Sequence, residues 1–526
     1  ILSACTFTYY LKKSQLKHSY MTAVFGVFYA FSAYFLAYYW NVMWLDGMIL
    51  LPLIALGIEN IINRGSGKLY ILSLVLLFVS SYYMGFMCCI FAVLYFIAYY
   101  LISNNVNAVI SPEKTFEKKY SLKALYNNKF INRGIKFAVF SMISAMLCAV
   151  TLIPTFIILR SCSATSDTFP STFESYFNIF DFITSHLAGL ETTIRSSGDD
   201  VLPNVYSGML AAILLPLFIV NKNIKLREKA VYIVLMLIFL FSFDNNCLNF
   251  IWHAFHFPND LPFRFSYMYS FILLVVGYKA ISKIKSLEIR DITFVGILWV
   301  FFIILAQKMS TTKMMETTIY TSIAFVIIWT GYLCLVRNGK ADKLIASALA
   351  VLICFSEVLI ADTQAILITQ SNSSYQENYA TYTEAIDKIK ADDEGFFRQE
   401  LCRLETRMDP CYFGYSGMST FSSMAYEDYS QLQYSLGMFG NRINSYTYNT
   451  QTPVYNMMFN IKYLLQTDVS IAPSENLYDY KFTTSDSKTN VYESKYFLPV
   501  SFAVNENTEL WDTTEGNPFD VQKDFF

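Results

Sequence analysis

The chain has 526 residues, of which 54% are hydrophobic and only 15% are charged, and its formal net charge is −2. Soluble globular domains carry about 25% charged residues, so this composition predicts an integral membrane protein and excludes an ordinary soluble domain. The nearly balanced charge gives no reason to expect a nucleic-acid partner. Tyrosine and phenylalanine are abundant, which is typical of membrane-interface belts and of surfaces that stack on sugars.

Apolar runs recur from the first residue to about residue 361, and a helix needs roughly 17–25 such residues to cross about 30 Å of hydrocarbon. They predict about twelve membrane spans. The predicted spans are 1–11, 19–39, 46–63, 69–83, 85–103, 135–160, 205–221, 229–243, 265–281, 291–307, 317–336 and 342–361. The first is partial, because Ile1 already lies in an apolar helix. We therefore expect the sequence to be an internal fragment of a longer protein.

The loops between the predicted spans alternate between basic and non-basic, and basic loops mark the cytoplasmic side. The segments predicted to face outward are 40–46, 161–204, 244–264, 308–316 and everything after about 362. The basic segment 104–136 is expected to lie as an amphipathic stretch on the inner leaflet. The 161–204 loop is acidic, which indicates either a solvated loop or a catalytic contribution.

The composition changes after Asp362, where apolar runs end and Ser, Thr, Asn, Asp and Tyr dominate. The sequence therefore predicts a transmembrane domain over 1–362 and an extracellular α+β domain over 363–526, incomplete at its end. Within the second domain we expect a helix over 381–390 and strands over 397–404, 461–466 and 490–500. Cys402 and Cys411 could pair there or stay free, and the ten cysteines show no metal-ligand spacing.

The segment 248–266 crowds polar, titratable and aromatic residues between two apolar runs, which is costly at a membrane and usually marks a site. The candidate substrate-binding residues of this segment are His253, His256, Asn259, Asp260 and Arg264. Arg264 opens a span, and its guanidinium matches phosphate oxygens in pairs. We expect it to hold the headgroup of a polyprenyl phosphate. The alternative is an arginine that snorkels to anchor the helix.

His253 and His256 are three residues apart, close to the spacing with which a helix presents two imidazoles to one metal ion. Pro258 and Pro262 leave room for a short helical turn only, and Asp260 is the one nearby third ligand. We therefore expect interfacial aromatic contacts or hydrogen bonds to a substrate phosphate rather than a metal site. No cofactor is expected, and the sequence leaves a divalent metal open.

A second polar and aromatic cluster, 41–47, lies at the start of another predicted span. Asp46 is the candidate catalytic residue, because a carboxylate at the membrane boundary can act as a general base or orient a sugar hydroxyl. Trp44 would offer an apolar face to a sugar ring or prenyl chain, with Asn41 one turn away. The alternative is that Asp46, just before Gly47, only caps a helix.

Tyr82 and Tyr83 are further candidate substrate-binding residues, predicted to lie in a short outer hairpin between two spans. They would either line a cavity or belong to a tyrosine belt. Glu59 lies within a span near its cytoplasmic end, which favours a structural pairing. No P-loop, nucleophile elbow or dinucleotide fingerprint occurs, so soluble nucleotide chemistry has no support.

Several short motifs follow one another along the chain in a fixed order. They are Trp44-Leu45-Asp46, Leu51-Pro52-Leu53-Ile54, Tyr82-Tyr83-Met84-Gly85-Phe86, the block 249–266, Tyr412-Phe413-Gly414-Tyr415-Ser416-Gly417, Phe421-Ser422-Ser423, Leu436-Gly437, Thr452-Pro453, Ile461-Lys462-Tyr463-Leu464-Leu465 and Leu498-Pro499. With these motifs the chain resembles the YfhO family of bacterial membrane proteins over nearly its whole length.

The resemblance implies a polytopic α-helical membrane protein of the GT-C type, with about twelve spans here and part of an extracellular α+β domain. It further implies a glycosyltransferase of the Gram-positive cell membrane. Such enzymes move a sugar from undecaprenyl-phosphate-sugar to an envelope polymer, here lipoteichoic acid or a similar one, at the outer face. The principal catalytic aspartate of GT-C enzymes lies in the first outer loop, which would precede Ile1. Asp46, in the family's WLD motif, is then a second acidic position.

Two other functions stay open from the sequence: a transporter or flippase of a lipid-linked precursor, and an envelope scaffold. Transporters more often show internal repeats and polar residues at mid-membrane. The polar clusters here fall at predicted outer helix ends, which favours an enzyme. The sequence does not identify the sugar, the acceptor, the stereochemistry, the metal dependence or the oligomeric state.

Overall fold

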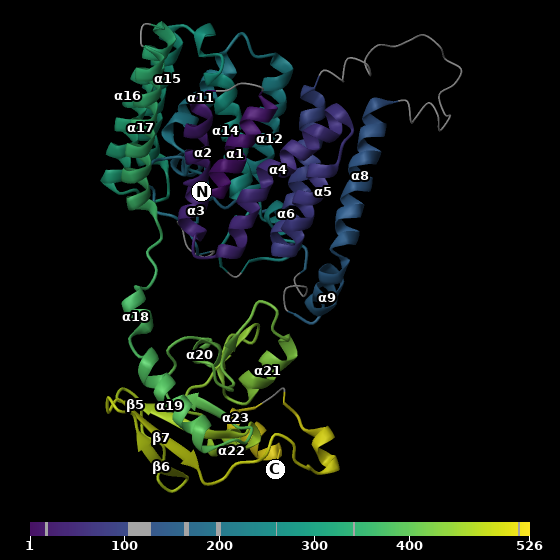
Figure 1. The fold of residues 1–526 in the computed structure, drawn as a ribbon, viewed down its shortest axis with the longest axis vertical. Helices are drawn as coiled ribbons and strands as arrows, with labels where there is room; N and C mark the ends of the chain where they lie inside the picture. Colours follow the sequence, from purple (N-terminus) through teal and green to yellow (C-terminus); the bar gives the residue numbers. More distant parts are fainter. Residues whose placement is uncertain are drawn as a thin grey trace, which may run out of the picture. The chain divides into compact units, whose positions relative to one another are not determined.

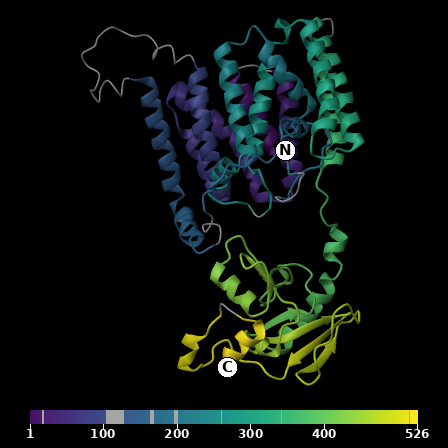
Figure 2. The ribbon, with the colours of Figure 1, turned by 180° about the vertical axis from the view of Figure 1, so that it is seen from behind.

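A computed structural model of the chain describes residues 1–15, 19–103, 128–162, 168–195, 201–258, 260–339, 342–513 and 516–525. The chain divides into two compact units, drawn in Figure 1 and from behind in Figure 2. The first unit, Ile1–Ile153 with Thr168–Ile368, is helical, and the second, Pro154–Asp167 with Thr369–Phe526, mixes helices and strands. The predicted assignment of 1–362 to the membrane and 363–526 to the outside stays a prediction.

The first unit consists of helices that pack side by side in both views. They are α1 (Leu2–Ser14), α2 (Met21–Ala30), α3 (Ala33–Tyr38), α4 (Val42–Arg64), α5 (Lys68–Ser80), α6 (Tyr82–Ile102), α8 (Lys129–Leu147), α10 (Ile179–Thr184), α11 (Met209–Val220), α12 (Leu226–Asp244), α13 (Asn246–Trp252), α14 (Ser266–Ile281), α15 (Ile289–Met309), α16 (Glu316–Asn338) and α17 (Lys343–Ala365). Helix α9 (Ala149–Leu159) begins in the first unit and ends in the second. Helices satisfy their backbone hydrogen bonds internally, which a lipid environment requires.

Seven helical stretches in the described part of the chain are long and apolar enough to cross a membrane. They are Met21–Tyr38, Val42–Arg64, Tyr82–Ile102, Lys129–Leu147, Ile289–Met309, Glu316–Asn338 and Lys343–Ala365. The shorter apolar helices α5, α9, α11 and α14 accompany them. Every predicted span contains a helix. The structure thus supports a multi-pass membrane protein, while the count of about twelve crossings stays a prediction.

Helix α14 forms the centre of the first unit, and all its residues except Lys279 are buried. It packs against α2, α4, α11 and α12, as expected for a helix that is apolar on all sides. In contrast, α8 buries only Ser144 and leaves Met142 and Met146 exposed. Long helices with outward apolar side chains are typical of surfaces that contact lipid.

The segments predicted to face outward contact one another at one end of the helices. The amide of Leu261 donates to the carbonyl of Ile194, and the hydroxyl of Tyr38 donates to the carbonyl of Pro262. Asp181 accepts a hydrogen bond from Ser310. These contacts join the 161–204, 244–264 and 308–316 loops to the end of α3. The side of the membrane on which they lie stays a prediction.

One predicted detail at this end is wrong, and one of the two alternatives for Asp46 is excluded. Ser81 alone joins α5 to α6, and its hydroxyl accepts a hydrogen bond from the Met84 amide as an N-cap. Tyr82 and Tyr83 therefore lie in the first turn of α6 instead of in a hairpin. Helix α4 begins at Val42 after Asn41, so Asp46 is already inside the helix and is not its N-cap.

The amphipathic segment predicted over 104–136 falls mainly on 104–127, which lie outside the described residues. From Lys129 onward it belongs to α8. The predicted single span 135–160 is divided at Cys148 between α8 and α9, and the span 19–39 is divided at Phe31 and Ser32 between α2 and α3.

The second unit contains two sheets. The larger has the strand order β1 (Arg398–Leu401), β5 (Ile461–Thr467), β7 (Thr489–Ser494) and β6 (Tyr478–Thr483). Strands β1 and β5 are parallel, and the other pairs are antiparallel. The smaller antiparallel sheet has the order β2 (Thr420–Phe421), β4 (Ser445–Thr447) and β3 (Phe439–Gly440).

The helices of the second unit are α18 (Asn372–Gln376), α19 (Tyr379–Asp392), α20 (Asp409–Phe413), α21 (Glu427–Ser435), α22 (Pro453–Met458) and α23 (Pro518–Phe525). Helix α19 confirms the prediction over 381–390, and β1 and β5 confirm two predicted strands. The third, predicted over 490–500, ends at Ser494. Strand β6 was not predicted, because only Tyr478 of its six residues is buried. Cys402 and Cys411 are both free thiols.

Candidate functional site

Unfavourable backbone conformations concentrate in the segment between α13 and α14. Ala254, Phe255, Leu261 and Phe263 have φ angles of 62°, 64°, 63° and 55°. Residues with a Cβ seldom adopt this left-handed conformation, which costs of order 1–3 kcal/mol at each position. The surrounding packing must hold the segment in place, and strain of this kind clusters at functional sites. The structure and the sequence therefore both indicate a functional site in the segment between α13 and α14.

Arg264 lies at the end of this strained segment, immediately before α14. Its Nε donates to the carbonyl of Leu261 at 2.9 Å and its Nη2 donates to the carbonyl of Asp260 at 3.0 Å. Neither carbonyl neutralises the positive charge. Among the described residues, no carboxylate forms an ion pair with Arg264, and its Nη1 has no hydrogen-bond partner. The guanidinium is therefore oriented while keeping donors free for an anion.

Two aromatic rings hold the Arg264 guanidinium from neighbouring helices. Its Cζ lies 4.7 Å from the ring centre of Trp44 on α4 and 5.1 Å from that of Tyr83 on α6. A desolvated cation–π contact contributes up to about 2 kcal/mol. We call Trp44, Tyr83, His253 and Arg264 the Arg264 cluster. Three segments far apart in the sequence meet in it, which explains why its geometry could not be predicted.

Close packing of α4 against α14 brings Trp44 to Arg264. A Cβ added to Gly47 would lie 2.8 Å from the hydroxyl oxygen of Tyr267 and 3.2 Å from the terminal methyl of Met84. Only glycine lets α4 approach this closely, since any side chain here would push the helices apart. Gly47 thus fixes the position of Trp44, one turn earlier on the helix.

His253 contributes a buried, uncharged acceptor to the cluster. Its Nδ1 lies 2.9 Å from the carbonyl oxygen of Asn249, which can only accept, so Nδ1 carries the proton. Burial and then the charge of Arg264 lower the pKa of His253 to about 3. The side chain is therefore neutral, and its Nε2 presents a lone pair. That Nε2 is buried without a hydrogen-bond partner among the described residues, as is the hydroxyl of Ser266 nearby.

Asp46 does not face the Arg264 cluster. It follows Trp44 by two positions, which corresponds to about 200° around a helix axis, so the two side chains point in nearly opposite directions. Asp46 is half-buried, and its carboxylate makes no hydrogen bond or ion pair with the described residues. No contact between Asp46 and the Arg264 cluster therefore supports the expectation that Asp46 and Arg264 act on the same substrate.

The remaining predicted site residues take different positions. Asp260 forms an ion pair with Arg195 at 3.5 Å, and both side chains are exposed. Asn41 precedes α4 without a side-chain cap, and His256 is half-buried beyond His253. The ring of Tyr82 lies 6.5 Å from that of Tyr83. Asn259 lies outside the described residues.

Two other buried carboxylates of the first unit, Asp181 and Glu59, have structural partners. Asp181, in the acidic 161–204 loop, accepts hydrogen bonds from Ser310 and Thr311 and closes a capping box with Asn178. Burial alone would raise its pKa, but these hydrogen bonds lower the pKa below the ordinary value. Asp181 thus ties two loops together, and the structure gives it no role at the cluster.

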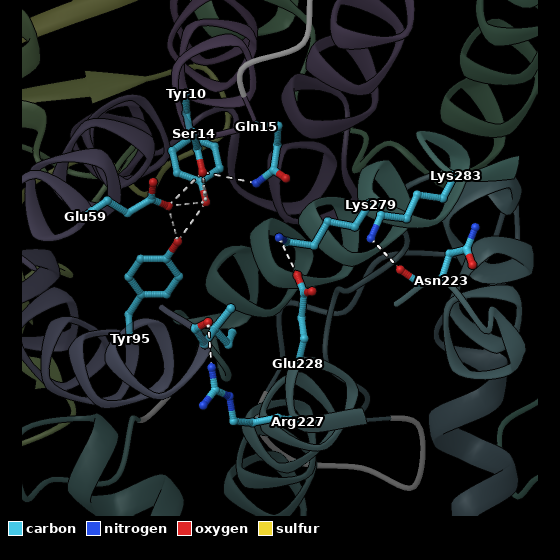
Figure 3. A network of polar contacts seen from close by, with 11 residues as sticks. Tyr10, Ser14, Gln15, Glu59, Tyr95, Asn223, Arg227, Glu228, Lys279 and Lys283 are labelled. Atoms are coloured by element: carbon cyan, nitrogen blue, oxygen red, sulfur yellow. Dashed lines mark hydrogen bonds and ion pairs between the residues drawn. The ribbon is translucent and has the colours of Figure 1, made fainter. Parts of the chain in front are cut away.

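Glu59 belongs to a hydrogen-bonded network within the helices (Figure 3). Its carboxylate accepts from the hydroxyls of Tyr10, Ser14 and Tyr95 at 2.9, 2.9 and 2.8 Å. The structural pairing expected for Glu59 is what the structure shows. The same view includes the ion pair of Lys279 with Glu228 at 2.7 Å.

Within the part of the chain that the structure describes, no group of three or more His, Cys, Asp or Glu side chains could hold a metal ion. His253 uses Nδ1 for the Asn249 carbonyl, which leaves Nε2 as its one available nitrogen. The chemistry of the cluster is therefore that of an anchored cation with a neutral hydrogen-bond acceptor beside it.

Comparison with known protein families gave one finding. The family model described as "Bacterial membrane protein YfhO" matches residues 1–526, the whole chain. Comparison with curated proteins and with solved structures gave no match.

Proposed function

Because the chain belongs to the YfhO family of bacterial membrane proteins, we propose that it is a membrane glycosyltransferase using a polyprenyl-phosphate-linked sugar. The observation that carries this proposal is the Arg264 guanidinium, held by two carbonyls and two aromatic rings without a carboxylate partner. A structural arginine would be neutralised by a carboxylate or would extend into water. An arginine fixed and left unpaired instead fits a phosphate ester.

In the proposed reaction, a hydroxyl oxygen of the acceptor attacks the anomeric carbon of the sugar. The bond from that carbon to the phosphate oxygen breaks, and undecaprenyl phosphate leaves with the bonding electrons. Arg264 stabilises the negative charge that develops on the departing phosphate, through Nη1 and its delocalised cation. A charge-assisted hydrogen bond of this kind contributes about 1.5–3 kcal/mol.

His253 is proposed to position the sugar. Its unprotonated Nε2 can accept a hydrogen bond from a sugar hydroxyl, and the buried nitrogen has no competing partner among the described residues. The rings of Trp44 and Tyr83 are of the kind that packs against the apolar face of a sugar ring or the first prenyl unit. Neutral His253 does not repel a cationic neighbour, so both residues can contact one substrate.

Asp46 is proposed as an acidic group for the acceptor, on the face of α4 away from Trp44. From that face an unpaired carboxylate can bind and orient hydroxyl groups of the acceptor. The family resemblance implies a principal base other than Asp46, and Asp46 would assist it by holding the acceptor. The proposed acceptor is lipoteichoic acid or a similar envelope polymer, and the proposed location of the cluster is the outer face of the bacterial membrane.

A transporter of the lipid-linked precursor is the second candidate, and one observation favours it. Glu357 is fully buried in α17, where it accepts hydrogen bonds from Tyr206 and Trp329. Carboxylates within membrane helices often mark transport pathways. The partners of Glu357 are neutral donors, which also fits a purely structural role. The Arg264 cluster is therefore the stronger observation, and it favours the glycosyltransferase.

The test is a transfer assay with the full chain in nanodiscs, given radiolabelled undecaprenyl-phosphate-glucose or -galactose and purified lipoteichoic acid. Wild type should label the polymer. Arg264→Lys keeps the charge but loses the paired donors, and we expect transfer to fall about 10- to 100-fold. Arg195→Lys, at an exposed arginine paired with Asp260, is the matched control and should transfer normally. Movement of donor between leaflets of proteoliposomes without any transfer would favour the transporter instead.

A further inference from the structure

The second unit contains a groove with a volume of about 1010 Å³, beside α21 and β3. It lies within this unit alone, and α21 supplies one wall while the β3 turn supplies another. The side chains that matter for its chemistry are Asp428, Gln431, Tyr434, Phe439, Arg442 and Gln451. None of them belongs to the Arg264 cluster, and the proposed transfer reaction assigns them no role.

Two aromatic side chains give the groove flat apolar faces. Tyr434 on α21 is 38% exposed, and Phe439 on β3 is 70% exposed. The Arg442 guanidinium lies 4.0 Å from the ring centre of Tyr434, and this contact holds the tyrosine ring in place. Among the described residues, no carboxylate forms an ion pair with Arg442. Aromatic faces of this kind match the C–H surface of a pyranose ring.

The polar side chains of the groove complement these faces. Asp428 and Gln451 make no side-chain hydrogen bond or ion pair within the described residues, and Gln431 uses only its Nε2, toward Glu427. Carboxylate, amide and guanidinium groups are planar and can bind neighbouring hydroxyls in pairs. One acidic and one basic side chain leave the groove without a dominant charge. This balance favours a neutral polyhydroxylated ligand over a polyphosphate.

Hydrogen bonds hold the turn that carries Arg442 in one conformation. The Asn441 Oδ1 accepts from the amides of Ile443, Asn444 and Ser445, and Arg442 itself has a φ of 64°. Three hydrogen bonds thus hold a conformation that arginine seldom adopts, and they direct its side chain over Tyr434. The protein therefore loses little conformational entropy when a ligand binds in the groove.

We infer that this groove binds a pyranose unit of a neutral glycan. The ring stacks on Tyr434, and its hydroxyls pair with Asp428, Gln431 and Arg442. The inference concerns binding only, and it stands whether or not the chain transfers a sugar. It gives the second unit a direct contact with carbohydrate.

Saturation-transfer-difference NMR on the full chain in nanodiscs tests this inference, because it detects ligands with Kd values of about 1 mM, or ~4 kcal/mol. The probes are the methyl pyranosides of glucose, galactose and N-acetylglucosamine, with glycerol 3-phosphate as the anionic comparison. With wild type, ring protons of at least one pyranoside should receive saturation. In Tyr434→Ala the Kd obtained from a titration of the saturation signal should rise about tenfold, equivalent to ~1.4 kcal/mol.

Two further variants separate binding from folding. Arg442→Gly removes the guanidinium and suits the positive φ, so it should weaken the pyranoside signal without lowering thermal stability. Tyr496→Ala removes an exposed tyrosine outside the groove and should bind normally. The inference is overturned if no pyranoside receives saturation, if Tyr434→Ala keeps the full signal, or if glycerol 3-phosphate binds better.

Discussion

Arg264 shows how one side chain can be costly for folding and useful for binding. Its charge is removed from bulk water by Trp44 and Tyr83, yet no described carboxylate compensates it. The two backbone carbonyls and two rings recover part of the desolvation cost. An anionic ligand would recover more, so the cluster should be more stable with a phosphate bound than without.

Asp46 offers a test in which activity and stability separate. Its carboxylate has no hydrogen bond or ion pair with the described residues, so Asp46→Asn should change the thermal midpoint little. If it orients the acceptor by hydrogen bonding, transfer should fall about tenfold or more. Parallel transfer and melting assays measure both quantities. An unchanged transfer rate would remove Asp46 from the site.

Glu400 on β1 should make the stability of the second unit depend on pH. Burial raises the pKa of its carboxyl from 4.5 to about 7, although the amides of Met418 and Ser419 donate to it and act in the opposite direction. A raised pKa means that the folded state holds the proton more tightly. The stabilisation is therefore complete below pH 4.5 and is lost as the pH rises through about 7.

Glu400→Gln should abolish this part of the pH dependence while keeping a neutral, hydrogen-bonding side chain. Thermal unfolding of wild type and variant across the same pH window measures the difference. We expect the wild-type midpoint to fall with rising pH more steeply than that of the variant. Equal slopes would show that Glu400 has an ordinary pKa in the folded protein.

At the scale of elements, the strained segment between α13 and α14 determines where Arg264 lies. Ala254 has a φ of 62°, so Ala254→Gly should relieve strain and raise the free energy of unfolding by up to about 1 kcal/mol. The looser segment should also position His253 less firmly, and transfer should fall several-fold. Melting and transfer assays on the same preparation give both values.

The matched control is Ala348→Gly, on an exposed position of the right-handed helix α17. There glycine should lower stability by about 1 kcal/mol without affecting transfer. A loss of stability in Ala254→Gly of the same size would contradict the role given to strain in this segment.

The sequence allowed the elements to be predicted better than their contacts. Helices were predictable because long apolar runs admit few other structures beside lipid, and 248–266 stood out as polar residues in such surroundings. The contact of Arg264 with Trp44 and Tyr83 was not predictable, because it depends on how α4, α6 and α14 pack. The alternative that Asp46 caps a helix arose because Asp-Gly resembles a helix start, whereas α4 begins at Val42.

In the second unit, alternation of apolar residues was enough to predict β1 and β5, whose side chains are largely buried. It was not enough for β6, which is mostly exposed, or for the strand order, which depends on distant pairing. The groove beside α21 had no signal in the sequence, because its side chains come from separate segments and are common at any surface.

At the scale of the whole molecule, the predicted orientation places the second unit outside the cell. Cys411 in this unit is an exposed free thiol. A membrane-impermeant maleimide should therefore label intact cells at Cys411, and Cys411→Ser should abolish that label. Lys285→Cys, in a basic and exposed connection predicted to be cytoplasmic, should react only after permeabilisation. The opposite pattern would reverse the topology.

The most direct test of the account is binding of undecaprenyl phosphate to the full chain, measured by its effect on the thermal midpoint. A ligand that binds only the folded state raises the midpoint, and the rise grows with the ratio of free ligand concentration to Kd. Undecaprenyl phosphate should stabilise wild type and Asp46→Asn but not Arg264→Ala, and undecaprenol, which lacks the phosphate, should stabilise none of them. Equal stabilisation of Arg264→Ala, or by undecaprenol, would contradict the assignment of Arg264 to the phosphate.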